Sequence, residues 1–284
     1  MNIYVLIATI DEGIHRVPSI LLPEQEGVRY VVSWQRRPTP SPSRDGGELA
    51  ALSTEKALLL RPDVTVSVIE GRGLCRNRNN AIKTAIDLLD DPLEDAVFII
   101  ADDDEQLMPE AFSRIREAYN NNPRLDGALF RMRSSKDGSY FKTYPPKAVT
   151  YGKHPRSYYP SSLEMSFRTR VWQAGLRFNE RFGLGSEQLC AGEEEVLLTD
   201  ITRKGLLVRI LPEDICYTEP ATTGDRALDD KMLRSKGAVY AYSHSLIWAF
   251  FRSWREALSL AVRSCRSPFP IFRNIWSGVK YIRS

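Results

Sequence analysis

The sequence predicts an α/β fold with a mostly parallel central sheet, followed by amphipathic helices in the C-terminal part of the chain. Short runs of β-branched and aromatic residues alternate with helical patterns over residues 3–119, which favours strand–helix–strand units with right-handed crossovers. Residues 97–101 are apolar throughout, as expected for a parallel strand that is covered on both faces. Beyond residue 236 the chain becomes helical, aromatic and basic. Ligands of an α/β sheet bind at the carboxyl ends of its strands.

Periodicity along the chain predicts the individual elements. We expect strands at residues 3–8, 29–33, 64–69, 97–101 and 206–211. A helix is expected at residues 77–89, where apolar side chains share one face: Ala81, Ile82, Ala85, Ile86 and Leu89. A second helix is expected to open at Pro109, which is a favoured first-turn residue. A third precedes the last strand and has an apolar face of Leu197, Leu198 and Ile201.

Composition excludes several protein classes. The chain has 284 residues, of which 43% are hydrophobic and 26% charged, so it is not disordered, collagen-like or a disulfide scaffold. The apolar run at residues 246–251 is far shorter than the roughly 20 residues that cross a bilayer. We see no signal-peptide pattern and expect a cytoplasmic protein. The cysteines are expected to be reduced thiols: Cys75, Cys190, Cys216 and Cys265.

The charge is distributed unevenly. The net charge is +3, but residues 231–284 carry ten Lys and Arg against one acid. The first 230 residues carry 29 Lys and Arg against 35 acids. A mildly acidic body with a strongly basic end predicts that this end meets an anionic partner.

The first acidic cluster follows the apolar strand at residues 97–101. Asp102, Asp103, Asp104 and Glu105 are adjacent in sequence, and such carboxylates repel one another unless a cation lies between them. At the carboxyl end of a strand, a divalent metal with a bound nucleotide's phosphates is the expected cation. A solvated acidic turn is the alternative that the pattern leaves open.

The second acidic cluster, residues 193–195, opens a predicted helix. The helix dipole favours acids in a first turn, which is a structural explanation for all three glutamates. The functional interpretation is that one carboxylate faces the carboxyl edge of the sheet and acts as a general base, kept ionised by the dipole.

Residues 71–79 join a predicted strand to a predicted helix. The segment contains two glycines and three arginines beside a helix N-terminus, which predicts a diphosphate site. It matches neither the Rossmann fingerprint nor a P-loop, because it lacks G-x-G-x-x-G and a Walker lysine. A basic loop without a ligand is the alternative.

In this order, these pieces resemble the family 2 glycosyltransferases, which are inverting enzymes with the GT-A fold. The similar segments are residues 3–9, 73–81, 102–104, and 178–185 followed by 192–194. The triplet at 102–104 looks like the family's D-x-D motif. The resemblance covers residues 1–225. It implies a GT-A type, Rossmann-like nucleotide-sugar domain there and leaves residues 226–284 as a basic helical extension.

On the donor side, the resemblance implies a divalent ion, Mn²⁺ or Mg²⁺, held by Asp102 and Asp104. It places Asp103 beside the ribose or sugar. Other residues implied to bind the nucleotide-sugar are Thr9, Asp11, Arg76 and Asn77. The expected donor is a nucleoside-diphosphate sugar, with UDP as its nucleotide.

On the acceptor side, the resemblance makes Glu194 the catalytic base, with Glu193 helping to hold the acceptor. It also implies that Ser162 and Glu164 line the sugar or acceptor pocket. The expected reaction transfers a hexosyl group, with inversion, to a hydroxyl of a glycan or lipid-linked glycan, as in polysaccharide assembly.

Two departures from the family pattern concern the donor. Most members have an acidic residue after the second strand that grips uracil, whereas this chain has Gln35, so Asp11 or Gln35 is expected to replace it or the base is not uracil. Many members also have a metal-binding His after the last core strand. Residues 216–224 contain none, so Glu219 replaces it or metal binding is weaker; the three histidines fit no ligand spacing.

The basic end predicts a membrane contact. Apolar residues at helical spacing alternate with arginines: Ile247, Phe250, Phe251, Trp254, Leu258 and Ala261 with Arg252, Arg255, Arg263 and Arg266. Residues 271–282 repeat the pattern. Such helices lie in a membrane interface and attract anionic lipids, here at the inner face of the membrane. The alternative is that they pack on the catalytic domain or on another subunit.

Three other function classes stay open. A Mg²⁺-dependent phosphohydrolase also places acids after a strand, and a sugar-phosphate nucleotidyltransferase shares the architecture. The third is a non-catalytic membrane-binding or nucleic-acid-binding module, although no nucleic-acid-binding motif occurs and we expect no nucleic-acid partner. Neither the donor sugar, the linkage nor the oligomeric state follows from the sequence.

Overall fold

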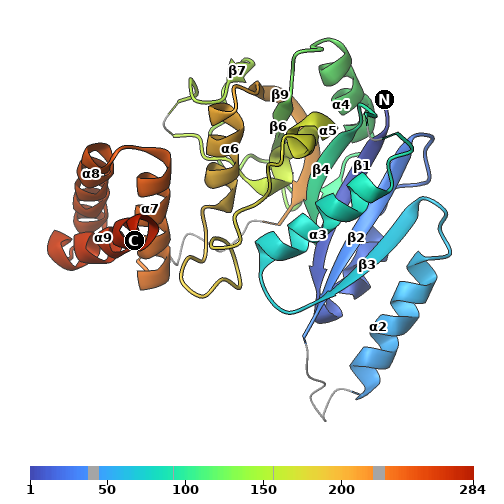
Figure 1. Cartoon of the computed structure of the whole chain (residues 1–284), viewed down its shortest axis with the longest axis horizontal. Coiled ribbons are helices and arrows are strands. Elements are labelled where there is room, and N and C mark those ends of the chain that lie inside the picture. Colours follow the sequence, from blue (N-terminus) through green and yellow to red (C-terminus); the bar gives the residue numbers. More distant parts are fainter. Residues whose placement is uncertain (38–44, 92, 156, 220–227) are drawn as a thin grey trace. The chain divides into compact units, whose positions relative to one another are not determined.

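The computed structural model describes residues 1–37, 45–91, 93–155, 157–219 and 228–284 (Figure 1). The chain forms two compact units. The first contains residues 1–72, 76–177 and 201–220, and the second contains residues 73–75, 178–200 and 221–284. The boundary expected after residue 225 lies outside the described residues.

A single sheet organises the first unit. In the part of the chain that the structure describes it has nine strands, ordered β3-β2-β1-β4-β8-β6-β9-β5, with β7 paired to β9. Its parallel part consists of β1 (Ile3–Ile10), β2 (Val28–Arg36), β3 (Val64–Glu70) and β4 (Val97–Asp102). The rest consists of β5 (Gln106–Leu107), β6 (Gly127–Ser134), β7 (Val149–Thr150), β8 (Met165–Arg168) and β9 (Val208–Thr218). The expected α/β fold is confirmed.

Strand β1 lies at the centre of the parallel part because it is apolar on both faces. Seven of its eight residues are buried, and only Ile10 at its end is exposed. It pairs in parallel with β2 and with β4, so that Ala8 lies opposite both Ser33 and Asp102. The carboxyl ends of β1 and β4 therefore lie side by side at one edge of the sheet.

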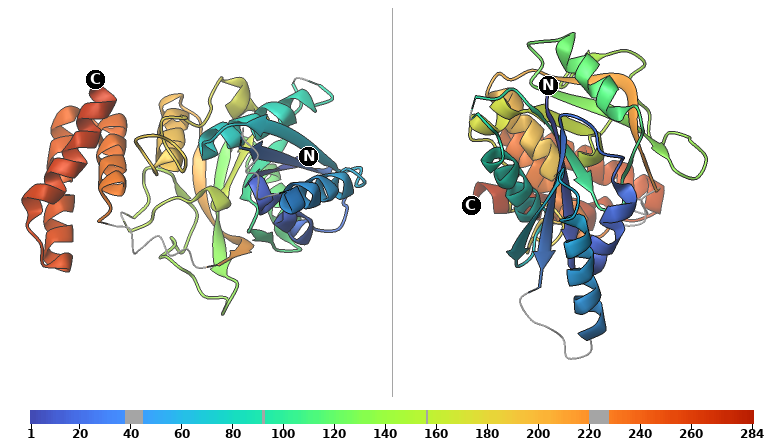
Figure 2. Two further views of the ribbon diagram at one scale, coloured as in Figure 1. Left: turned by 90° about the horizontal axis from the view of Figure 1, so that it is seen from below. Right: turned by 90° about the vertical axis from the view of Figure 1, so that its right-hand side faces the viewer.

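Helices cover both faces of the parallel part. Figure 2 (right) shows α3 (Leu74–Asp87) on one face, and α1 (Val17–Ile20) and α2 (Asp45–Leu58) on the other. The α3 residues Ala81, Ile82 and Ala85 are fully buried, as their spacing predicted. Asn80 fixes this helix to the sheet by donating hydrogen bonds to the hydroxyls of Ser33 on β2 and Ser67 on β3.

Several boundaries differ from the prediction. Helix α3 begins at Leu74 rather than at residue 77, so Arg76 lies in its first turn while Arg72 stays before the helix. The strand expected at 206–211 begins at Val208 and continues to Thr218. Helix α4 (Ala111–Asn120) is found where a helix was expected, but it begins two residues after Pro109, the predicted first residue. Short elements complete the first unit: η1 (Asp11–Arg16), η2 (Ser162–Glu164) and α5 (Thr169–Gln173).

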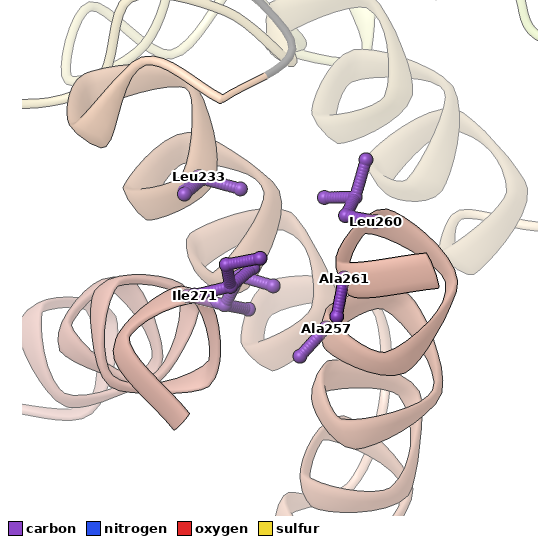
Figure 3. Packing of buried hydrophobic residues seen from close by; sticks show 6 residues of the cluster. Leu233, Ala257, Leu260, Ala261 and Ile271 are labelled. Carbon is purple, nitrogen blue, oxygen red and sulfur yellow. The ribbon is translucent and has the colours of Figure 1, made fainter. Parts of the chain in front are cut away.

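The second unit is helical. It contains most of α6 (Glu193–Arg203), together with α7 (Asp230–Ser243), α8 (Leu246–Ser264) and α9 (Pro268–Arg283). Figure 3 shows the core that joins the last three helices, with Leu233 of α7, Ala257, Leu260 and Ala261 of α8, and Ile271 of α9. None of the helices that the structure describes is both long and apolar enough to cross a membrane.

Helices α7 and α9 approach each other at two glycines. A Cβ atom built on Gly237 would lie 1.7 Å from the carbonyl oxygen of Ile275, and one built on Gly278 would lie 1.8 Å from that of Arg234. These separations are far shorter than any real contact. The close packing of α7 on α9 therefore requires glycine at both positions.

Candidate active site

The carboxyl ends of β1 and β4 bring the first acidic cluster against the first loop. Thr9 of β1 donates a hydrogen bond of 2.5 Å from its hydroxyl to the Asp103 carboxylate, which follows β4 directly. Arg16 of η1 donates to the other oxygen of the same carboxylate, with Nη2 at 2.5 Å. Asp103 is buried, and both of its oxygens are engaged by protein donors.

Gly13 makes this arrangement possible. A Cβ atom on Gly13 would lie 2.2 Å from Oδ2 of Asp103 and 2.7 Å from the hydroxyl of Thr9. The η1 turn therefore fits against Asp103 only because residue 13 has no side chain. The sequence pattern did not single out Gly13 or Arg16, since their partner Asp103 lies far along the chain.

Asp102 is held by a buried arginine of α3. Nη2 of Arg78 lies 2.9 Å and 3.2 Å from the two oxygens of Asp102, and it also donates to the hydroxyl of Ser162 at 2.7 Å. The Arg78 side chain is only 2% exposed, whereas that of Asp102 is 30% exposed. Ser162, expected in an acceptor pocket, is buried and positions Arg78. The carboxylate of Asp102 is thus paired with the guanidinium of Arg78, which Ser162 and burial hold in place.

Asp104 differs from its neighbours in the triplet. It is exposed at the sheet edge, and its pKa is raised, first by partial loss of solvent and then by the charges of Asp102 and Asp103. Glu105 is buried, and burial raises its pKa well above the ordinary range. Asp104 is therefore the member of the triplet whose charge a bound cation would stabilise most directly.

The residues present fit an open metal site rather than a closed one. Among the described residues, no three His, Cys, Asp or Glu side chains are grouped so that they alone could hold a metal ion. The triplet nevertheless offers carboxylate oxygens, the ligands that Mg²⁺ and Mn²⁺ accept. Partial loss of solvent raises the pKa of Asp104 most, and the charges of Asp102 and Asp103 add to this shift, so a bound cation would favour its ionised form. Phosphate oxygens of a ligand would have to complete such a site.

The expected nucleotide residues lie around the end of β1. Asp11 has φ of 48°, the left-handed region, and its carboxylate lies 2.6 Å from Nε of Arg37. Its carbonyl oxygen accepts a hydrogen bond from the indole of Trp34 at the end of β2. Gln35, the other residue considered for the base, is buried. The hydrogen bond from Trp34 thus fixes the start of η1 at the carboxyl end of β1, where Asp11 lies at the edge of the sheet.

Asn77 and Arg76 lie in the first turns of α3 and face different surroundings. Asn77 is buried and donates from Nδ2 to the carbonyl oxygen of Thr9 at 2.8 Å, which ties the start of α3 to the end of β1. Arg76 is exposed, and its guanidinium lies so close to Gly71 that a Cβ atom there would approach it to 2.6 Å. Arg76 therefore offers an exposed guanidinium that could bind a phosphate, whereas the neutral amide of Asn77 is buried.

Glu164 lies inside the protein rather than on a pocket surface. It is fully buried, and its carboxylate lies 2.7 Å from the ammonium of Lys142 and accepts hydrogen bonds from the hydroxyls of Tyr144 and Tyr158. Burial raises the pKa of Glu164, and Lys142 opposes this shift. Glu164 ends η2 and has no exposed surface, so its carboxylate joins η2 to Lys142, Tyr144 and Tyr158 instead of facing an acceptor as expected.

The second unit contains the other acidic cluster, and the structure places it in the first turn of α6 as predicted. Glu193 is buried, and a Cβ atom on Gly183 would lie 3.2 Å from its carboxyl carbon. Glu194 is partly exposed. Burial, and then the charge of Glu194, raise the pKa of Glu195 to about 7, while Lys236 and Arg252 oppose the shift. The three glutamates therefore differ in environment although they are adjacent.

The segment expected on the acceptor side packs on the start of α3. The backbone N–H of Leu74 donates to the carbonyl oxygen of Leu184 at 2.8 Å, and the thiol of Cys75 donates to the carbonyl oxygen of Phe182 at 3.1 Å. Gly183 and Gly185 in this loop have φ of 89° and 84°. These contacts fix the loop beside Glu193 within the second unit.

Comparisons with known proteins bear on the fold. Neither the protein-family models nor the curated proteins give a match. The fold resembles that of TarS from S. aureus. The structure of TarS residues 1–349 has a TM-score of 0.59 and 13% identity, over 100% of this chain and 91% of that one. The same TarS segment in complex with UDP-GlcNAc has a TM-score of 0.60 and 12% identity, with 100% and 92% coverage.

A longer TarS structure matches with a TM-score of 0.59 and 13% identity, over 97% of this chain and 55% of the TarS chain. The present chain thus spans about half of that protein. At this level of identity the likeness to TarS shows the fold alone. The candidate site residues, and Glu219, which is exposed just after β9, stay predictions. Residues 220–224 lie outside the described part of the chain.

Proposed function

We propose that this chain is a nucleotide-sugar-dependent glycosyltransferase of the inverting, GT-A type. The observation that carries the proposal is the acidic triplet, anchored by Arg78 and Arg16 at the carboxyl edge of β4 in a sheet that resembles the fold of TarS. One TarS structure holds UDP-GlcNAc, which is the kind of donor that we propose for this chain.

The donor would bind at the carboxyl edge of β1 and β4. Asp102 and Asp104 would hold a divalent ion, Mn²⁺ or Mg²⁺, which neutralises the diphosphate of the donor when it is bound. Arg76 would contact the phosphates and Asp11 the nucleoside, with UDP as the expected nucleotide. Asp103, Thr9 and Asn77 would act mainly by positioning, because their polar groups already join β1, η1 and α3.

The acceptor hydroxyl would be activated by Glu194. Its oxygen forms a bond to the anomeric carbon while the bond from that carbon to the diphosphate breaks, and the hydroxyl proton passes to the Glu194 carboxylate. Attack opposite the leaving group inverts the configuration, and no sugar–enzyme bond forms. Glu193 would orient the acceptor. The proposed acceptor is a glycan or lipid-linked glycan on the cytoplasmic side of a membrane.

Release of nucleoside diphosphate tests this function. The protein is incubated with UDP-GlcNAc and other nucleotide-sugars, with Mn²⁺ or Mg²⁺, and the freed nucleotide is measured. We expect release from at least one donor, and a loss of roughly 100-fold or more in Glu194→Gln and in Asp104→Asn. Glu187→Gln, at an exposed position before α6, is the matched control and should keep full activity. Wild-type rates in both site variants would overturn the proposal.

A further inference from the structure

Helix α8 has an apolar stripe on its outer side. Ile247, Phe251, Leu258 and Val262 are between 51% and 81% exposed. Their spacing of four, seven and four residues puts them on one side of a helix. Trp248, also exposed, lies at the start of the same helix. Exposed apolar side chains that line up in this way mark a surface that another partner covers.

The stripe is distinct from the side of α8 that packs inside its own unit. Ala257, Leu260 and Ala261 are buried and contact α7 and α9 through the core shown in Figure 3. Ala249 is buried in a second cluster with Ala241 of α7 and Val279 of α9. Ser253 completes this inner side. The apolar residues that the sequence pattern grouped together therefore divide into two faces. One face holds the three helices together, and the other faces outward.

Cations border the stripe. Helices α8 and α9, with the short segment that joins them, contain seven Lys and Arg and a single acid, Glu256, whose carboxylate pairs with Lys236 of α7. Six of these cations are exposed and have no ion pair within the described part of the chain: Arg255, Arg263, Arg266, Arg273, Lys280 and Arg283. Phe250 and Trp254 of α8 pack on aromatic rings of α9, and the helical spacing puts Arg255 and Arg263 on the opposite side of the stripe from these two residues. The surface is thus apolar along its centre and positive at its margin.

We propose that the outer stripe of α8 docks this protein onto an anionic lipid bilayer, with the helix in the plane of the interface. The apolar side chains would enter the boundary of the acyl chains, and the bordering arginines would meet lipid phosphates. Indole rings favour this depth of a membrane, which suits Trp248. A second copy of the chain is a poorer occupant, because pairing two such faces would bring their arginines together.

This inference does not rest on the proposed function, since it uses no residue of the candidate active site. The test is co-sedimentation of the full chain with vesicles of phosphatidylcholine alone, or of equal parts phosphatidylcholine and phosphatidylglycerol. We expect binding to the anionic vesicles that is at least roughly tenfold stronger and weakens with salt. The tryptophan emission should also shift to the blue on binding.

Two double variants make the test specific. Phe251→Gln with Leu258→Gln removes apolar surface from the stripe and should weaken vesicle binding by roughly tenfold or more. Leu59→Gln with Leu60→Gln removes exposed leucines after α2 and should leave binding unchanged. Both positions of the stripe pair are exposed, so the folded state should persist, and circular dichroism checks it.

Three results would overturn the proposal. The first is a wild-type chain that does not bind the anionic vesicles. The second is a stripe variant that binds as tightly as the wild type. The third is a wild-type dimer in light scattering that the stripe variant converts to a monomer, because the stripe would then be an interface between two copies. Nucleotide release by the same samples reports separately on the proposed enzyme.

Discussion

Arg78 connects α3 to the acidic triplet more directly than any pattern in the sequence suggested. Its guanidinium contacts both oxygens of Asp102 and the hydroxyl of Ser162, and its side chain is buried. A buried cation of this kind fixes the carboxylate before any ligand arrives. Removing Asp102 would leave the buried Arg78 charge unpaired, and removing Arg78 would leave the partly exposed Asp102 carboxylate without its cation.

Removing this arginine should therefore cost both stability and donor binding. We expect Arg78→Ala to lower the free energy of unfolding by about 2–3 kcal/mol in urea titration, less than for a fully buried pair because Asp102 is partly exposed. Arg72→Ala, an exposed arginine just before α3, is the control and should change stability by less than about 0.5 kcal/mol. Equal effects of the two substitutions would mean that the Arg78–Asp102 pair does not stabilise the fold.

Glu195 makes stability depend on pH. Its pKa is raised to about 7 in the folded chain, above its ordinary value of 4.5. The folded state therefore keeps a proton that the unfolded state loses between these values. Its contribution to stability is fully present below pH 4.5 and is lost as the pH rises through 7.

Glu195→Gln should stabilise the chain at high pH only. We expect a gain of about 2–3 kcal/mol at pH 8 and under about 1 kcal/mol at pH 5, measured by chemical unfolding at both values. Glu187→Gln, an exposed glutamate, should show neither effect. A gain of the same size at both pH values would show that the carboxyl of Glu195 titrates normally.

The sequence predicted functional residues where the side chains that act together are adjacent in the chain. The triplet at Asp102, Asp103 and Asp104 stands out because adjacent carboxylates repel one another. Lys142 could not be found as the partner of Glu164, since 22 positions and several loops separate them and the pairing depends on how residues 135–161 fold. Glu164 was consequently expected at a pocket surface although it is buried.

At the scale of elements, the close approach of α7 and α9 gives the sharpest prediction. Gly278→Ala would place a methyl group against the Arg234 carbonyl oxygen and push the two helices apart. We expect a loss of about 2–3 kcal/mol in thermal unfolding, even though alanine favours the helix itself. Ser259→Ala, an exposed position on α8, should have little effect. A Gly278→Ala variant as stable as the wild type would contradict the close packing.

Elements with strong periodicity were predicted well, and short ones were not. Strands β1 to β4 follow from apolar runs that a parallel sheet buries on both faces. Strands β5, β7 and β8 have two to four residues, too few for any period to show. Glycines and arginines favour a loop at residues 71–76, so the sequence predicts the start of α3 three residues too late. In the structure the helix begins at Leu74, whose backbone N–H donates to the carbonyl oxygen of Leu184.

At the scale of the whole molecule, the α/β class followed from the alternation of elements, and the likeness to TarS agrees with it. The outward stripe of α8 did not follow, because helical spacing alone cannot tell which apolar residues face a neighbouring helix. The two units are not divided at a single position in the sequence, since residues 178–200 belong with the C-terminal helices. Such groupings depend on contacts between distant segments.

We propose above all that the acidic edge of the sheet binds a nucleoside diphosphate together with a divalent ion. The most direct test is the Tm of the full chain with UDP, GDP, dTDP and CMP, each with and without Mn²⁺ or Mg²⁺. Because a ligand that binds only the folded state raises the Tm, we predict a metal-dependent increase with one of the diphosphates. Asp104→Asn should abolish the increase and Asp87→Asn, exposed on α3, should keep it. No increase with any nucleotide, with or without either metal, would contradict the claim.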